Sequence, residues 1–245
     1  MKFFLSNWFI FCTVSLMSEP ARPSQGKVIL IHGIINHRSM STLNRQFKRD
    51  GWDVINWKYP STKKTIEEHG RDLAAAIRNI SNDSETPIHY VAFSLGGLVL
   101  RAALSDSNLP PAAKEGKVIL ISSPINGSKL ARSIDLVPLA NKILGKHAGR
   151  ELQKTSPGDF SERSFPQNMP LLVLSGTFGL NPIFREKNDG KVSVSECCPK
   201  TPHIHKYVLA GHAWICRNPM VFDACVDFIK DRSVNSLCIE QKKYI

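Results

Sequence analysis

The chain has 245 residues, of which 42% are hydrophobic, and its formal net charge is +11. This length and composition fit a single α/β domain with a full hydrophobic core. The lysines and arginines are scattered, and no nucleic-acid motif or aromatic stacking pattern accompanies them, so the sequence argues against nucleic-acid binding. The positive charge suits nonspecific attraction to anionic membranes, and it suits a solvated basic surface equally well.

Residues 1–26 differ from the rest of the chain. Lys2 precedes a mostly apolar run of about 15 residues, 3–17, which is typical of a secretory signal. A proline-containing linker, residues 18–26, follows it. We expect the folded domain to span residues 27–245 and the protein to be exported, to the periplasm or outside the cell. An uncleaved segment that holds it at a membrane is the alternative.

Strand-like and helix-like patterns alternate through the remaining chain. Such alternation predicts a mostly parallel sheet covered by helices on both faces. Thr65 and Glu68 have the spacing of a capping box at the start of one helix. The expected strands are 28–32, 52–57, 88–93, 117–122, 171–175 and 206–209, and the expected helices are 41–48, 65–80, 95–104 and 217–230.

One long connection, residues 126–169, interrupts this alternation. Its first part, 130–144, has apolar residues at helical spacing around Pro138, and its second part is polar and rich in proline. Long connections are often lids or mobile loops, so we expect a short helical lid that suits an acyl-chain pocket. A helix packed on the edge of the sheet is an equal alternative.

Ser94 stands between an expected buried strand, 88–93, and an expected helix, 95–104. A serine on such a sharp turn is the nucleophile elbow of serine hydrolases, and the strained turn requires small neighbours. Ala92 and Gly96 are those neighbours, so the usual Gly-x-Ser-x-Gly pattern is changed at Ala92 only. An ordinary tight turn before a helix would also explain this segment alone.

The strand 28–32 ends at His32-Gly33, where the backbone can turn and expose an amide. Acyl transfer needs two backbone N–H donors for the developing oxyanion, one after the nucleophile and one from the end of an early strand. The amides of Leu95 and Ile34 are the candidates. We interpret His32 as a structural residue that shapes this loop.

Two further candidates follow later in the chain. Asp189 lies in Asn-Asp-Gly, which is also a common solvated turn, and His212 lies on a loop between an expected strand and helix. Such loops meet at the same sheet edge as Ser94. His212 would accept the Ser94 proton and Asp189 would orient the imidazole. His203 and His205 compete for the role of base, but they precede or begin the strand and are expected to point elsewhere.

The order Ser, Asp, His resembles that of the α/β-hydrolase superfamily, and more narrowly its lipase- and esterase-like members. Residues 123–128 are similar to the Pro-x-x-Gly-Ser stretch that follows the sixth strand in that group. The likeness also includes residues 145–152, 175–177 and 188–192, and it extends over about 28–230. It implies an α/β-hydrolase fold with Ser94 as nucleophile, Asp189 as acid, His212 as base, and the Ile34 and Leu95 amides as oxyanion donors.

This reading predicts a serine hydrolase of carboxylic esters that forms an acyl-enzyme on a small-molecule or lipid ester, with no cofactor. Acyl transfer to another alcohol by the same triad, and a catalytically silent binding protein of the same fold, are the alternatives. Association with a membrane surface is compatible with this reading, and the sequence leaves the oligomeric state open.

The cysteines are concentrated near the end of the chain. Apart from Cys12 they are Cys197, Cys198, Cys216, Cys225 and Cys238. This set permits one or two disulfide bridges with at least one odd thiol, and Cys197-Cys198 beside Pro199 favours a loop with one bridge. A metal site is not expected, because the sequence has no Cys-x-x-Cys or His-x-x-His grouping.

Overall fold

A parallel sheet of six strands forms the centre of the structure, a computed structural model that describes residues 25–34, 37–82, 86–133, 147–154 and 164–232. The sheet order is β2-β1-β3-β4-β5-β6, and every neighbouring pair is parallel. The strands are β1 (Lys27–Ile31), β2 (Asp53–Trp57), β3 (Ile88–Phe93), β4 (Val118–Ile121), β5 (Leu171–Gly176) and β6 (Ile204–Val208). The expected α/β architecture with a parallel sheet is confirmed.

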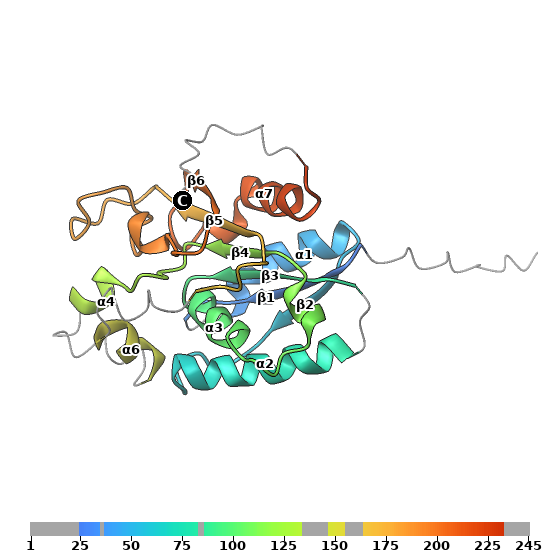
Figure 1. The fold of residues 1–245 in the computed structure, drawn as a ribbon. Coiled ribbons are helices and arrows are strands. Elements are labelled where there is room, and N and C mark those ends of the chain that lie inside the picture. The colour runs from blue at the N-terminus through green and yellow to red at the C-terminus, as the bar shows by residue number, and fades with distance from the viewer. Residues whose placement is uncertain (1–24, 35–36, 83–85, 134–146, 155–163, 233–245) are drawn as a thin grey trace, which may run out of the picture.

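Helices cover both faces of this sheet (Figure 1). On one face lie α1 (Ser41–Arg49) and α7 (Pro219–Ile229), and on the other lie α2 (Ile66–Asn82) and α3 (Leu95–Leu104). Successive residues of β1 alternate between the two cores: Ile29 packs on the α2 and α3 side, and Leu30 packs on the α1 and α7 side. Burial on both faces is why these strands have continuous apolar runs.

Helix α2 begins as its sequence predicts. The Thr65 amide donates to the Glu68 carboxylate at 2.8 Å, and the Glu68 amide donates to Thr65 Oγ1 at 3.1 Å, so the capping box is confirmed. A Cβ added at Gly70 would lie 2.6 Å from Ala102 Cβ. The missing side chain therefore lets α2 and α3 approach closely.

In its described residues, the long connection contains the short helices α4 (Lys129–Ser133) and α6 (Ala148–Lys154), which contact each other (Figure 1). The Ala148 amide donates to the Lys64 carbonyl at 3.1 Å, and the Glu151 carboxylate accepts from the Ile66 amide at 2.6 Å. Helix α6 is thus packed against the start of α2. Residues 134–146 and 155–163, on which a lid depends, lie outside the described residues, so the lid stays a prediction.

The segment expected to be a secretory signal also lies outside the described residues, which begin at Gln25. Among the helices that the structure describes, none has the length and apolarity needed to cross a membrane. Export therefore remains a prediction.

The expected disulfide at Cys197-Cys198 is absent: within the described residues, Cys197, Cys198, Cys216 and Cys225 are all free thiols. The Cys197 side chain is buried in the core beside α3, and the Cys198 thiol donates to the Val194 carbonyl at 3.4 Å. Both thiols thus contact groups other than a second cysteine. The adjacency of Cys197 and Cys198 in the sequence could not indicate these contacts.

Candidate active site

Ser94 occupies the turn between β3 and α3 with φ 54° and ψ −125°. An L-residue with positive φ is strained, and the surrounding structure must hold it in place. The Ser94 amide donates to the Ile121 carbonyl at 2.9 Å, which ties the turn to β4. The sharp, strained turn expected from the sequence is therefore present.

Neighbouring segments approach the start of α3 so closely that two of its positions have room only for glycine. A Cβ added at Gly96 would lie 2.5 Å from the Ile31 carbonyl oxygen, and a Cβ at Gly97 would lie 2.4 Å from Ser123 Oγ. Neither position accepts a side chain without a shift of its neighbours. Ala92 is different, because its methyl group is fully buried in the core that contains α3. The turn forms with alanine in the position where the usual pattern has glycine.

The three side chains expected to act together do lie together. His212 Nε2 is 3.1 Å from Ser94 Oγ, and His212 Nδ1 is 2.6 Å from Asp189 Oδ2. The loop after β6 supplies His212, and the loop between β5 and β6 supplies Asp189. The ring of Phe93 packs against the imidazole with centroids 4.8 Å apart. A continuous hydrogen-bonded chain thus runs from the hydroxyl to the carboxylate.

The carboxylate of Asp189 is held at both oxygens. Oδ1 accepts from the amides of Lys191 at 2.9 Å and Val192 at 2.8 Å, which leaves Oδ2 for His212. Burial alone raises the pKa of Asp189, but the hydrogen bond and charge of His212 and the two amides outweigh it and lower that pKa below its usual value. Asp189 is therefore an anion at neutral pH, not a solvated turn residue.

The loop after β1 lies directly against Ser94. A Cβ added at Gly33 would be 2.9 Å from Ser94 Cβ, so the backbone that leads to Ile34 passes beside the hydroxyl. Leu95 opens α3 immediately after Ser94, where helix N-terminal amides favour negative charge. The assignment of these two amides as oxyanion donors stays a prediction, and this arrangement supports it.

The contacts of His32 fit the expected structural role, in which it shapes the loop after β1. Its Nδ1 is 2.7 Å from the Gly33 carbonyl, and its ring stacks on Tyr59 with centroids 4.3 Å apart. Tyr59 also donates its hydroxyl to the His32 carbonyl at 2.8 Å. Burial lowers the pKa of His32, which favours the neutral ring. Tyr59 thereby holds the loop beside Ser94, a role that its place after β2 did not indicate.

Glu196 is a second residue that the sequence did not single out. Its buried carboxylate accepts from the amides of Ser193, at 2.7 Å, and Lys129. It thus joins the loop that carries Asp189 to the start of α4. Burial raises the pKa of Glu196 although both amides oppose the change. In the sequence, only the closeness of Glu196 to Asp189 could have indicated this role.

The competing histidines lie elsewhere, as expected. His203 Nδ1 is 2.9 Å from the Thr201 carbonyl, and His205 Nε2 is 2.8 Å from Ser175 Oγ. Neither of these contacts involves Ser94. His212 is the histidine that reaches it.

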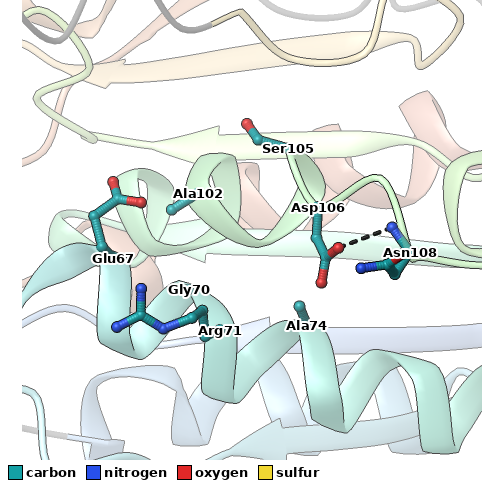
Figure 2. A pocket seen from close by; sticks show the side chains of 8 residues that line it. All are labelled: Glu67, Gly70, Arg71, Ala74, Ala102, Ser105, Asp106 and Asn108. Atoms are coloured by element: carbon teal, nitrogen blue, oxygen red, sulfur yellow. Dashed lines mark hydrogen bonds between the residues drawn. The ribbon is translucent and has the colours of Figure 1, made fainter.

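A separate hollow of about 450 Å³ lies between α2 and α3 (Figure 2). Its polar lining includes Glu67, Arg71 and Asp106, and the Asp106 carboxylate accepts from the Asn108 amide at 2.8 Å. The lining residues of α3 come from its C-terminal end, whereas Ser94 adjoins its N-terminal end. This hollow is not part of the Ser94 site.

Several solved structures are similar to this one. Lipase BlEst2 of Bacillus licheniformis, in its mature form, superposes with a TM-score of 0.70 at 20% identity, over 86% of this chain and 94% of its own. The metagenomic carboxyl esterase MGS0156 gives 0.63 at 16% identity over 89% and 80% of the two chains. Esterase Pf2001 of Pyrococcus furiosus gives 0.55 at 18% identity over 85% and 84%. The chain has a lipase- and esterase-like α/β-hydrolase fold.

The α/β-hydrolase fold explains where the site lies. From β1 the chain crosses to β2 on one side, and from β3 it crosses to β4 on the other side, so the loops after β1 and β3 diverge at this point of the sheet. Open α/β sheets bind ligands at the carboxyl ends of their strands near such a point. No protein-family model matches the chain, and no curated protein matches it by sequence.

Proposed function

We propose that the protein is a serine hydrolase of carboxylic esters that acts through Ser94, His212 and Asp189. The observation that carries the proposal is the hydrogen-bonded chain from Ser94 Oγ through His212 to Asp189, at 3.1 and 2.6 Å. This is the arrangement by which a base activates a weak nucleophile while a third group orients the base. The esterases and lipases among its structural neighbours supply further support.

The proposed reaction has two stages, formation of an acyl-enzyme and its hydrolysis. Ser94 Oγ attacks the ester carbonyl carbon as its proton passes to His212 Nε2, and the Ile34 and Leu95 amides donate to the oxyanion. The tetrahedral intermediate collapses, and the alcohol leaves with the proton from His212. A water molecule that gives its proton to His212 then attacks the acyl-enzyme and releases the acid and Ser94. Asp189 stabilises the imidazolium in both steps.

Apolar side chains near the site favour an acyl or lipid ester as substrate. Phe178, Leu180, Leu209 and Trp214 are all exposed, and they lie on the loops after β5 and β6 that flank His212. The Phe178 amide donates to the Ala210 carbonyl at 3.3 Å, so the two loops are neighbours. Exposed apolar residues grouped in this way are typical of a binding surface. Together with the positive net charge, they support contact with a membrane surface.

Labelling with a fluorophosphonate tests the proposal. This reagent phosphonylates activated serines with loss of fluoride, so we expect one adduct, located on the Ser94 peptide by mass spectrometry. Ser94→Ala should abolish the adduct, whereas Ser105→Ala, at the end of α3, should retain it. An unlabelled but folded protein would support the silent binding alternative instead and overturn the proposal.

Product analysis separates hydrolysis from acyl transfer. Both reactions share the acyl-enzyme and differ in the group that accepts the acyl chain. Esters of graded chain length are incubated with and without a competing alcohol, and the free acid and the new ester are measured. Free acid as the dominant product at modest alcohol concentration supports the hydrolase, whereas new ester as the dominant product supports a transferase.

A further inference from the structure

Cys198, His203 and His205 converge at the start of β6, apart from the Ser94 site. One potential ligand atom from each residue lies within 4.8 Å of the others. The rings of His203 and His205 have centroids 5.8 Å apart and are tilted by 52°. Both histidines are buried, whereas Cys198 is only partly buried, so the group is reached from the side of the thiol.

The distance between two of these groups matches the edge of a zinc tetrahedron. Cys198 Sγ is 3.5 Å from His205 Nδ1. Zinc bonds of about 2.3 Å to sulfur and 2.0–2.1 Å to nitrogen, at the tetrahedral angle, separate the two ligand atoms by about 3.6 Å. Binding would thus require little movement of these two side chains.

The hydrogen bonds of the two histidines orient them as metal ligands. His203 Nδ1 lies 2.9 Å from the Thr201 carbonyl, which only accepts, so Nδ1 carries the proton and Nε2 carries the lone pair. His205 Nε2 lies 2.8 Å from Ser175 Oγ, which leaves Nδ1 facing the thiol. A ligating histidine usually donates its other ring N–H to a carbonyl or similar group in this way.

We propose that Cys198, His203 and His205 bind one zinc ion, with a water molecule in the fourth position. Binding replaces the Cys198 thiol proton, now donated to the Val194 carbonyl, and releases it to solvent as the thiolate bonds to zinc. The thiolate and two imidazoles form the mixed sulfur and nitrogen set that zinc prefers. The carboxylate of Glu186, whose charge acts on Cys198, adds to the attraction, although Lys129 pairs with it at 2.9 Å.

The ion would stabilise the loop that carries Asp189 by linking it to β6. Cys198 lies on the same loop between β5 and β6 as Asp189, and His205 contacts Ser175 of β5. The next residue, Gly176, packs so closely on Asp189 that a Cβ there would lie 2.7 Å from the Asp189 Cβ. Zinc would therefore join the loop to β6 and, through β5, support the position of the acid. This is a stabilising site, independent of the ester hydrolase proposal.

Zinc binding to the full chain provides the test. We expect one zinc per chain by titration of metal-free protein against a chromophoric chelator. At zinc one hundredfold above its dissociation constant, Tm should rise by about 5 to 10 °C. Cobalt in place of zinc should give the absorption band of thiolate bound to Co²⁺.

Variants decide whether these residues hold the ion. Cys198→Ser and His203→Gln should each lose stoichiometric binding and the Tm rise, whereas Cys197→Ala, next in sequence but outside the group, should keep both. Circular dichroism in the absence of zinc checks that each variant is folded. Absence of binding to wild type at micromolar zinc, or binding that persists in both folded ligand variants, would overturn the proposal.

Discussion

Asp189 and His212 are joined twice, once through their side chains and once through their backbones. His212 Nδ1 lies 2.6 Å from Asp189 Oδ2, and the His212 amide donates to the Asp189 carbonyl at 2.9 Å. The second bond holds the two loops in register, so the imidazole meets the carboxylate without depending on one contact between flexible side chains. Prepositioning of this kind spares the site the cost of ordering its groups during the reaction.

Replacement of the nucleophile is the most direct test of the site. We expect Ser94→Ala to lower kcat/KM for a short-chain aryl ester by at least a thousandfold, because no other hydroxyl contacts His212 Nε2 in the described structure. The fold should persist, since the change removes one oxygen atom. Tm and circular dichroism are measured on the same samples. Retained turnover in the folded variant would refute the assignment of Ser94.

The role of Asp189 is tested by a substitution that removes its negative charge and keeps nearly the same shape. Asp189→Asn keeps an oxygen for the Lys191 and Val192 amides but turns an amide N–H toward His212 Nδ1, which then cannot donate. We expect kcat to fall by about a thousandfold to ten-thousandfold with KM little changed. Asp231→Asn, at an exposed position, is the matched control. Equal kinetics for the two variants would remove Asp189 from the site.

Adding a methyl group two residues after Ser94 should be far more damaging than removing the one two residues before it. Gly96→Ala places a Cβ 2.5 Å from the Ile31 carbonyl and 2.7 Å from the His32 carbonyl, so we expect a large loss of both activity and stability. Ala92→Gly removes a buried methyl group and should cost about 1 kcal/mol, with kcat/KM changed by less than about tenfold. Ester kinetics and urea denaturation measure both effects. A large gain of activity in Ala92→Gly would show that alanine impairs the turn.

The stability of the fold should fall in acid partly because of His89. Burial, and then the charge of Lys117, lower the pKa of His89 to about 4, and its Nδ1 accepts from the Lys117 amide at 3.2 Å. Above pH 6.5 the ring is neutral in both states, and its contribution is complete. As the pH falls below 6.5, the unfolded chain binds the proton first, and about 2 to 3 kcal/mol is lost by pH 4.5.

His89→Asn keeps an acceptor for the Lys117 amide but does not titrate. Between pH 7.5 and pH 4.5, wild type should therefore lose about 2 kcal/mol more unfolding free energy than the variant. Urea denaturation at the two pH values measures the difference. Parallel losses in the two proteins would show that His89 is not the group responsible.

Local patterns were sufficient to predict the sheet and the sharp turn at Ser94. The strand β3 and the helix α3 have the bounds expected from their sequence, because an apolar run and a small-residue turn act over neighbouring residues. The order of Ser94, Asp189 and His212 along the chain indicated the hydrogen-bonded group for the same reason, since each residue follows a recognisable element. The expected bridge was wrong for the cysteines that the structure describes, because the Cys198 thiol lies against the Val194 carbonyl and His205 instead of another thiol.

The sequence by itself determined the parallel α/β fold and indicated that His212 and Asp189 lie together with Ser94, because the periodicity of burial and the loops after strands are local properties. Only the tertiary structure decided that Gly96 and Gly97 have no room for a Cβ, that Tyr59 and Glu196 brace the loops, and that Cys198 faces His205. The contacts of Gly96, Gly97 and Tyr59 join segments that pairing of β1 with β2 and β3, and of β3 with β4, brings together. Their distances depend on how the strands are ordered across the sheet, which no short stretch of sequence encodes.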